Sequence, residues 1–197
     1  MDSNTPGAAN AYPKVGPIVI TEIMYHPDWP TGGNYANDEY EFIELRNTSG
    51  ASVTLYDSIE DAPWKFTSGI DYTFPSPPSA VTIPAGGRIL VVKNPTAFNW
   101  RYPGLTSITY GPYSGWLSNS GERLELGKPG DLDEFAVRQY MRVERVNYSD
   151  GSHPGDDDPD LWPINADGLG KSLTRTSQSL YGNDPNNWTA ATPTPGT

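Results

Sequence analysis

The chain has 197 residues, of which 36% are hydrophobic, and it carries a formal net charge of −11. Phosphate backbones and anionic membrane surfaces bind proteins largely through Lys and Arg, so this chain is expected to bind neither nucleic acid nor anionic lipid. The absence of cysteine excludes disulfides, thiolate nucleophiles and cysteine-ligated zinc. No apolar run approaches the ~20 residues of a membrane span, and direct membrane insertion is not expected.

The two ends of the chain have the composition of linkers. Residues 1–16, MDSNTPGAANAYPKVG, contain almost no apolar periodicity, so we expect a linker there, a single domain over 17–190 and a C-terminal linker over 191–197. Both ends contain the tripeptide Thr-Pro-Gly. It indicates either a piece of a tandem array, in which the first copy closes a preceding similar domain, or the ordinary composition of a linker.

Between these ends, short apolar segments recur at intervals bounded by Gly, Pro, Asn and Ser. The predicted strands are 17–25, 40–47, 52–57, 63–68, 71–75, 81–83, 88–93, 122–127, 141–148 and 171–176. Residues 95–102 predict a short helix, because Pro95 suits a first turn and Phe98 and Tyr102 are four residues apart. Residues 131–141 fit either a second short helix or a continuing strand.

This series of short strands predicts an all-β protein, an antiparallel β-sandwich with one or two short helices. Residues 88–93, RILVVK, alternate Ile89 and Val91 with Leu90 and Val92, so both faces of that strand are apolar. Such a strand is predicted to lie in the interior of a sheet.

Several glutamates lie within apolar strands and raise the question of catalysis. Glu41 shares a strand face with Ile43 and Leu45, whereas Glu44 points to the opposite face. These two carboxylates therefore cannot converge on one substrate, although Glu22 can approach either of them if 17–25 pairs with 40–47. We favour a structural role, in which a buried glutamate accepts hydrogen bonds from Tyr, Trp or backbone donors. Metal binding and catalysis are the alternatives.

The segment 149–163, SDGSHPGDDDPDLWP, concentrates acidic side chains in one loop. Closely spaced carboxylates are the hard oxygen ligands that calcium requires, although the spacing is not that of an EF-hand. The predicted calcium ligands are Asp150, Asp156, Asp157, Asp158 and Asp160. The alternative is a solvated acidic loop after which Trp162 packs back on the sandwich.

Aromatic residues near turns form a further candidate site. They are Trp29, Trp100, Tyr102, Tyr110, Tyr113 and Trp116. Exposed rings of this kind stack on sugars, and the alternative is packing at the ends of the sandwich. No nucleophile-elbow motif and no glycine-rich phosphate loop appears, so no catalytic residue is predicted.

An ordered series of segments resembles the lamin tail domain family, and its bacterial branch most closely. The segments are IVITEIMYHP, EYEFIELRNTSG, TIPAGGRILVVKNPTAFNWRYPG, LSNSGERLELGKPGD, RVERVNYSD and the ending from DPDLWP to TPTPGT. The resemblance covers about 18–196 and implies an immunoglobulin-like β-sandwich. The chain has no coiled-coil rod and no basic nuclear-localisation run, so the nuclear roles of animal lamins are not carried over.

The resemblance and the missing catalytic motifs together predict a non-catalytic accessory or interaction domain of an exported or cell-surface multidomain bacterial protein. Its role is expected to be spacing, anchoring or binding. The expected partners are neighbouring domains of the same polypeptide and a protein or glycan ligand, and calcium is the one cofactor considered. The alternatives are a calcium-dependent or carbohydrate-binding adhesion module, and an enzyme that uses converging carboxylates.

Overall fold

The computed structural model describes residues 14–153 and 159–197, and these residues form mostly β-strands with few helices. The strands are β1 (Ile18–Met24), β2 (Phe42–Asn47), β3 (Val53–Thr54), β4 (Tyr56–Asp57), β5 (Ala62–Pro63), β6 (Lys65–Ser68), β7 (Thr82–Ile83), β8 (Arg88–Val92), β9 (Thr109–Tyr110), β10 (Gly121–Leu132), β11 (Arg138–Ser149), β12 (Ser172–Arg175) and β13 (Trp188–Ala191). The helices are α1 (Pro95–Arg101) and the 3-10 turns η1 (Asn37–Tyr40), η2 (Thr106–Ile108), η3 (Ile164–Ala166) and η4 (Pro185–Asn187).

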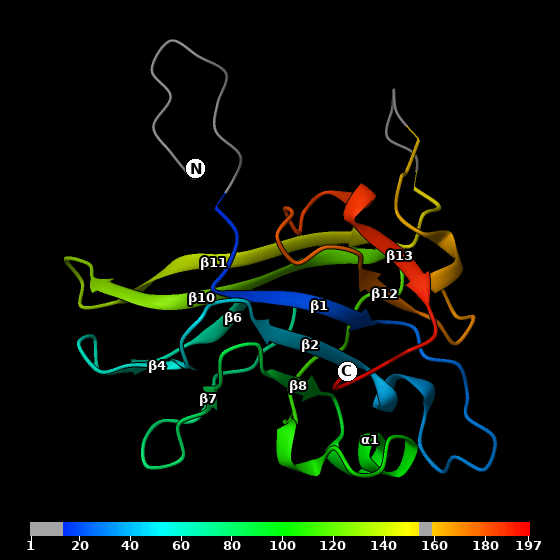
Figure 1. The fold of residues 1–197 in the computed structure, drawn as a ribbon, viewed down its shortest axis with the longest axis horizontal. Coiled ribbons are helices and arrows are strands. Elements are labelled where there is room, and N and C mark those ends of the chain that lie inside the picture. The colour runs from blue at the N-terminus through cyan, green and yellow to red at the C-terminus, as the bar shows by residue number, and fades with distance from the viewer. Residues whose placement is uncertain (1–13, 154–158) are drawn as a thin grey trace.

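Two sheets form the body of the molecule (Figure 1). The larger has the strand order β13-β12-β1-β2-β8-β9, and its pairs are antiparallel except for the parallel pair β8–β9. The smaller has the order β11-β10-β6, and its long β10–β11 hairpin runs alongside β1 in Figure 1. Two short pairs, β3–β7 and β4–β5, flank these sheets.

One hydrophobic core lies between the two sheets. Alternate residues of the larger sheet, among them Ile43 and Leu45 of β2, pack against Leu124, Leu126 and Val146 of the β10–β11 hairpin. Each of these side chains is buried. Burying an aliphatic side chain of this size stabilises a fold by about 1.5–3 kcal/mol, so this interior holds the two sheets together.

A second apolar cluster covers the opposite face of the larger sheet, which we call the outer face. Phe42 of β2 and Leu90 and Val92 of β8 pack there against Phe98 of α1. The predicted helix is confirmed, and it begins where Asn94 caps it by accepting hydrogen bonds from the first free backbone N–H groups of α1. Strand β8 is paired on both sides, as its two apolar faces predicted.

Most predicted strands are found, with several differences. Residues 52–57 divide into β3 and β4, and residues 71–75 form only isolated bridges to Lys65 and Ser114. The predicted strand 63–68 divides between β5 and β6, and strands β9 and β13 were not predicted. Residues 131–141 form the tip of the β10–β11 hairpin, so the helical alternative is wrong there. Asp133 explains this, because its Oδ1 accepts the N–H groups of Phe135 and Val137 and closes a turn.

The C-terminal residues, expected as a linker over 191–197, lie against the domain. Ala191 ends β13, Pro195 is buried, and the C-terminus lies beside β2 and β8 in Figure 1. The backbone N–H groups of Thr194 and Gly196 donate hydrogen bonds to side chains of β1 and β2. The predicted linker 1–16 falls mostly outside the described residues. Within 14–153 and 159–197, the helices all lack the length and apolarity needed to cross a membrane.

Candidate functional site

The glutamates of β1 and β2 are buried, and a β-bulge decides which of them meet. The register between the two strands shifts between Ile20 and Glu22, so Thr21 is an extra residue in β1. Strict alternation from Ile20 would turn Glu22 toward the core. The extra residue instead places Glu22 opposite Glu44 on the outer face of the sheet.

Glu44 connects three elements through its carboxylate. Its Oε1 accepts hydrogen bonds from Thr21 Oγ1 at 2.6 Å and from Arg88 Nε of β8 at 3.0 Å. Its Oε2 accepts the backbone N–H of Gly196 at 2.7 Å. The Arg88 guanidinium balances the charge of this buried carboxylate, and both carboxylate oxygens accept structural hydrogen bonds.

Glu22 makes the equivalent connection one strand away. Its Oε1 accepts hydrogen bonds from Ser172 Oγ of β12 at 2.5 Å and from the backbone N–H of Thr194 at 3.1 Å. Burial raises the pKa of Glu22 to about 7, an effect that outweighs these two hydrogen bonds, and the nearby carboxylate of Glu44 raises it further. The outer face therefore carries a row of polar side chains, Ser172–Glu22–Glu44–Arg88, that crosses four strands.

Glu41 points to the other side of the sheet, as its position in the strand predicted. Its Oε2 accepts hydrogen bonds from the hydroxyl of Tyr113 at 2.5 Å and from the backbone N–H of Leu117 at 2.9 Å. Burial raises the pKa of Glu41 to about 8, which makes the protonated acid the dominant form at neutral pH. Glu41 thus anchors the segment around 113–117 to β2.

A fourth buried carboxylate, Glu144 of β11, was missed in the sequence. Its Oε1 lies 3.4 Å from Arg175 Nη1 of β12, and that guanidinium also donates to the carbonyl of Ile20 at 3.0 Å. Burial raises the pKa of Glu144 to about 7, although Arg175 opposes the shift. The alternation of MRVERVNY placed Glu144 on the apolar face with Val146, and this was the signal that could have identified it.

The acidic loop brings together two of the predicted calcium ligands and one residue that was not predicted. Ligand atoms of Asp150, His153 and Asp160 lie within 4.8 Å of one another. Asp156, Asp157 and Asp158 fall outside the described residues. Calcium takes six to eight oxygen ligands, and the described residues supply two carboxylates and an imidazole, which suits calcium less well.

These two carboxylates also build the loop itself. Asp150 Oδ1 accepts the N–H of Ser152 at 2.8 Å and lies 3.0 Å from His153 Nδ1. Asp160 accepts the hydroxyl of Ser149 and the N–H of Trp162. Burial acts to raise the pKa of Asp150, but the hydrogen bonds from Ser152 and His153 outweigh it and hold the pKa below its ordinary value. Calcium binding here stays a prediction.

Trp162 follows the loop and packs on the core, with its ring centroid 6.0 Å from that of Trp188. This contact is the one expected from the alternative interpretation of the segment, in which the acidic loop is solvated and Trp162 packs back on the sandwich. It shows how the acidic loop is tied to β13.

The aromatic candidates divide into exposed and packed rings. Tyr113 is buried against Glu41, and Tyr102 and Tyr110 are half-buried. The three tryptophans are exposed, with 62% of Trp29, 48% of Trp100 and 69% of Trp116 accessible to solvent. Large rings left in water in this way are available to stack on a ligand.

The exposed ring of Trp116 lines a hollow. The hollow has a volume of about 360 Å³, and Asp38, Ser118 and Asn119 line it together with Leu117. An indole ring beside hydroxyl, amide and carboxylate groups is the arrangement with which proteins hold sugars, since the ring takes the apolar face of a pyranose and the polar groups orient its hydroxyls.

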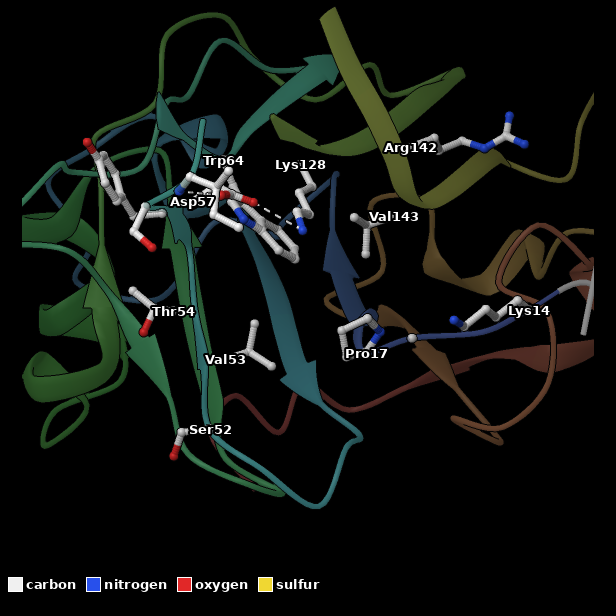
Figure 2. A pocket seen from close by; sticks show the side chains of 14 residues that line it. Lys14, Pro17, Ser52, Val53, Thr54, Asp57, Trp64, Lys128, Arg142 and Val143 are labelled. Atoms are coloured by element: carbon white, nitrogen blue, oxygen red, sulfur yellow. Dashed lines mark hydrogen bonds and ion pairs between the residues drawn. The ribbon is translucent and has the colours of Figure 1, made fainter. Parts of the chain in front are cut away.

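A second, larger hollow of about 630 Å³ lies between the β3–β4 segment and residues 142–143 of β11 (Figure 2). Val53, Trp64 and Val143 give it an apolar wall, and Lys14, Lys128 and Arg142 line it as well. Figure 2 shows Lys128 directed at Asp57, with its Nζ 3.1 Å from Asp57 Oδ2. Asp57 also lines the hollow and pairs with Lys128, so Lys14 and Arg142 supply its remaining positive charge.

Comparisons with known proteins do not identify the chain. No family model, curated protein or solved structure matches it. The resemblance to lamin tail domains therefore remains a prediction from the sequence, and the geometry described above is the basis for a functional proposal.

Proposed function

We propose that this chain is a non-catalytic accessory or interaction domain of an exported or cell-surface multidomain bacterial protein. One observation carries the proposal: Glu22 and Glu44, the carboxylates that meet on one face, accept hydrogen bonds from Ser172, Thr21 and Arg88 and from the C-terminal backbone. Carboxylates that act on a substrate must have free oxygens aimed at a shared space. Here Oε1 of Glu22 and both oxygens of Glu44 join four strands and the C-terminal segment into one unit.

The finer assignment is to an immunoglobulin-like sandwich of the lamin tail type. Two facing β-sheets with a shared core support it, as does the small share of helix. Its expected setting is outside the cell, beside other domains of the same polypeptide. Spacing and anchoring need a stable body, and the core shared by the two sheets provides one.

The proposal is tested by assaying the purified chain against chromogenic glycosides, esters and phosphate esters. We expect no turnover above buffer. The matched variants are Glu22→Gln and Glu41→Gln, with exposed Glu134→Gln as the control. Turnover by the wild-type chain that disappears in Glu22→Gln, with the fold retained, would overturn the accessory role and support an enzyme with converging carboxylates.

A carbohydrate-binding adhesion module is the second candidate, and the exposed ring of Trp116 in its polar hollow favours it. A glycan array with wild-type chain and Trp116→Ala tests it. Loss of a specific glycan signal in Trp116→Ala, and its retention in Trp29→Ala, would support sugar binding at this hollow. An array without any specific signal would remove the candidate.

A further inference from the structure

The outer face of the larger sheet holds the C-terminal segment at two backbone positions. Glu22 accepts the N–H of Thr194 and Glu44 accepts the N–H of Gly196. Pro195, which has no N–H to offer, lies between them and is buried. The two carboxylates are therefore spaced to receive a tripeptide whose first and third residues donate and whose middle residue is an apolar proline.

The third position of this tripeptide requires glycine. Gly196 has φ +83, a left-handed conformation that other residues rarely adopt. A Cβ at this position would lie 3.0 Å from Leu105 Cδ2 and 3.2 Å from Ile108 Cδ1, two side chains of the apolar cluster on the outer face. The backbone conformation therefore selects glycine, and a larger residue would also have to displace the ends of Leu105 and Ile108.

The same tripeptide occurs once more in the chain, as Thr5-Pro6-Gly7. We propose that the site formed by Glu22, Glu44, Leu105 and Ile108, the tripeptide site, is a docking site for a Thr-Pro-Gly segment of a second copy of this chain. Thr5 supplies the first N–H, Pro6 the apolar middle residue and Gly7 the third N–H without a side chain. Each requirement that the site places on its own C-terminal segment is met.

A second copy can occupy the site only by displacing the chain's own C-terminal segment. The C-terminal segment of the same chain is attached to β13, so its local concentration at the site is high and segments from other copies compete poorly. Two chains of net charge −11 also repel each other, and salt weakens that repulsion. We therefore expect copies to associate more strongly at higher salt. We also expect stronger association when the chain's own Gly196 no longer occupies the site.

This inference deepens the interaction role proposed above by naming a partner, yet its test measures peptide docking and not turnover. Failure of docking would leave the non-catalytic role intact, and the discovery of turnover would not affect docking. The two ideas can therefore fail separately.

The first experiment opens the site in the full-length chain. The double variant Gly7→Val with Gly196→Val prevents both tripeptides from docking, and a fluorescein-labelled peptide SNTPGAA is then titrated by anisotropy. We expect binding to this variant, at least tenfold weaker binding when Glu44→Gln is added, and at least tenfold weaker binding of the reversed-tripeptide control SNGPTAA. Equal binding of the two peptides would overturn the proposal.

A second measurement keeps the test independent of the stability of that variant. Thr197 is exposed and the chain has no cysteine, so Thr197→Cys gives a single site for an environment-sensitive dye. Peptide SNTPGAA should change the dye signal by displacing the closing segment, and SNGPTAA should not. An unchanged signal at millimolar SNTPGAA would contradict the proposal.

Sedimentation velocity then identifies the partner. Gly196→Val alone, which retains Thr5-Pro6-Gly7, should form dimers or larger species that increase with protein and salt concentration. Gly7→Val with Gly196→Val should remain monomeric, as should the strain control Gly104→Val, whose glycine has φ +94 and no neighbour within 4 Å of a Cβ. A monomeric Gly196→Val chain would overturn docking between copies.

Discussion

The glutamates show at the scale of single residues how environment decides chemistry. Glu41 accepts two hydrogen bonds through Oε2, while its other oxygen, Oε1, is buried without a partner among the described residues. A proton on Oε1 removes the charge from that buried oxygen, in agreement with a pKa raised to about 8 by burial. The sequence indicated which face Glu41 occupies, but burial depth depends on the packing of distant segments such as the one containing Tyr113.

Replacing Glu41 with glutamine tests this account of its protonation. Glutamine has the shape of the neutral acid and cannot ionise. We expect Glu41→Gln to have nearly wild-type stability at pH 5 and to be more stable than wild type at pH 9, where Glu41 is ionised in the folded chain. Urea denaturation at both pH values measures the difference, and equal stabilities at pH 9 would contradict the raised pKa.

The acidic loop gives a second prediction at this scale. If calcium binds, Asp150 and Asp160 must turn from loop hydrogen bonds to the ion, and excess calcium then stabilises the folded chain by mass action. We expect the melting temperature to rise by a few degrees in millimolar calcium and not in Asp150→Asn with Asp160→Asn. Magnesium is the control cation, since its demand for octahedral geometry differs. An identical melting temperature with and without calcium would exclude a calcium site of useful affinity.

At the scale of elements, the alternation of apolar residues predicted most strands and the capped helix α1. It did not predict the bulge in β1, because the extra residue Thr21 fits an unbroken strand equally well. This one position moves Glu22 from the core face to the outer face, and with it the site for the C-terminal segment. Strand β13 was missed because WTAA has little apolar pattern, and only its pairing with β12 defines it.

Asn47 fixes the turn after β2 and is a test of local structure. Its Nδ2 donates to the carbonyls of Ala51 and Ile83 at 2.7 and 2.9 Å, and its Oδ1 accepts the N–H of Ser49 at 2.9 Å. We expect Asn47→Ala to cost about 2–4 kcal/mol, because it leaves buried groups without partners. The helix cap variant Asn94→Ala should cost about 1 kcal/mol. Equal losses in urea denaturation would contradict this ranking.

At the scale of the whole molecule, composition predicted the all-β class, and turn residues predicted the antiparallel pairing. The sequence could not show that the closing segment belongs to the domain, because Thr, Pro and Gly have the composition of a linker. Their docking depends on Glu22 and Glu44, which lie 172 and 152 residues away in the chain. The larger hollow beside β3 and β4 was also missed, because its residues Lys14, Lys128 and Arg142 are far apart in the sequence.

The buried acids also determine how stability varies with pH. The pKa values of Glu22, Glu41 and Glu144 lie at about 7, 8 and 7 in the folded chain, above the ordinary value of 4.5. Between these limits the folded state binds more protons than the unfolded state, so stability falls as pH rises from about 4.5 to 8. We expect the melting temperature to drop by roughly 5–10 °C from pH 5 to pH 8. A melting temperature that rises over this interval would contradict the assignment.

The free energy of unfolding of Glu44→Ala, measured by urea denaturation against Glu134→Ala, tests most directly whether these carboxylates hold the fold. Removal of Glu44 leaves Arg88, Thr21 and the N–H of Gly196 without their acceptor, so we expect a loss of about 3 kcal/mol or more, whereas the exposed control should change stability by less than about 0.5 kcal/mol. Residues kept for catalysis or ligand binding commonly weaken a fold. A Glu44→Ala chain as stable as wild type, or more stable, would contradict a structural role and point to a functional one.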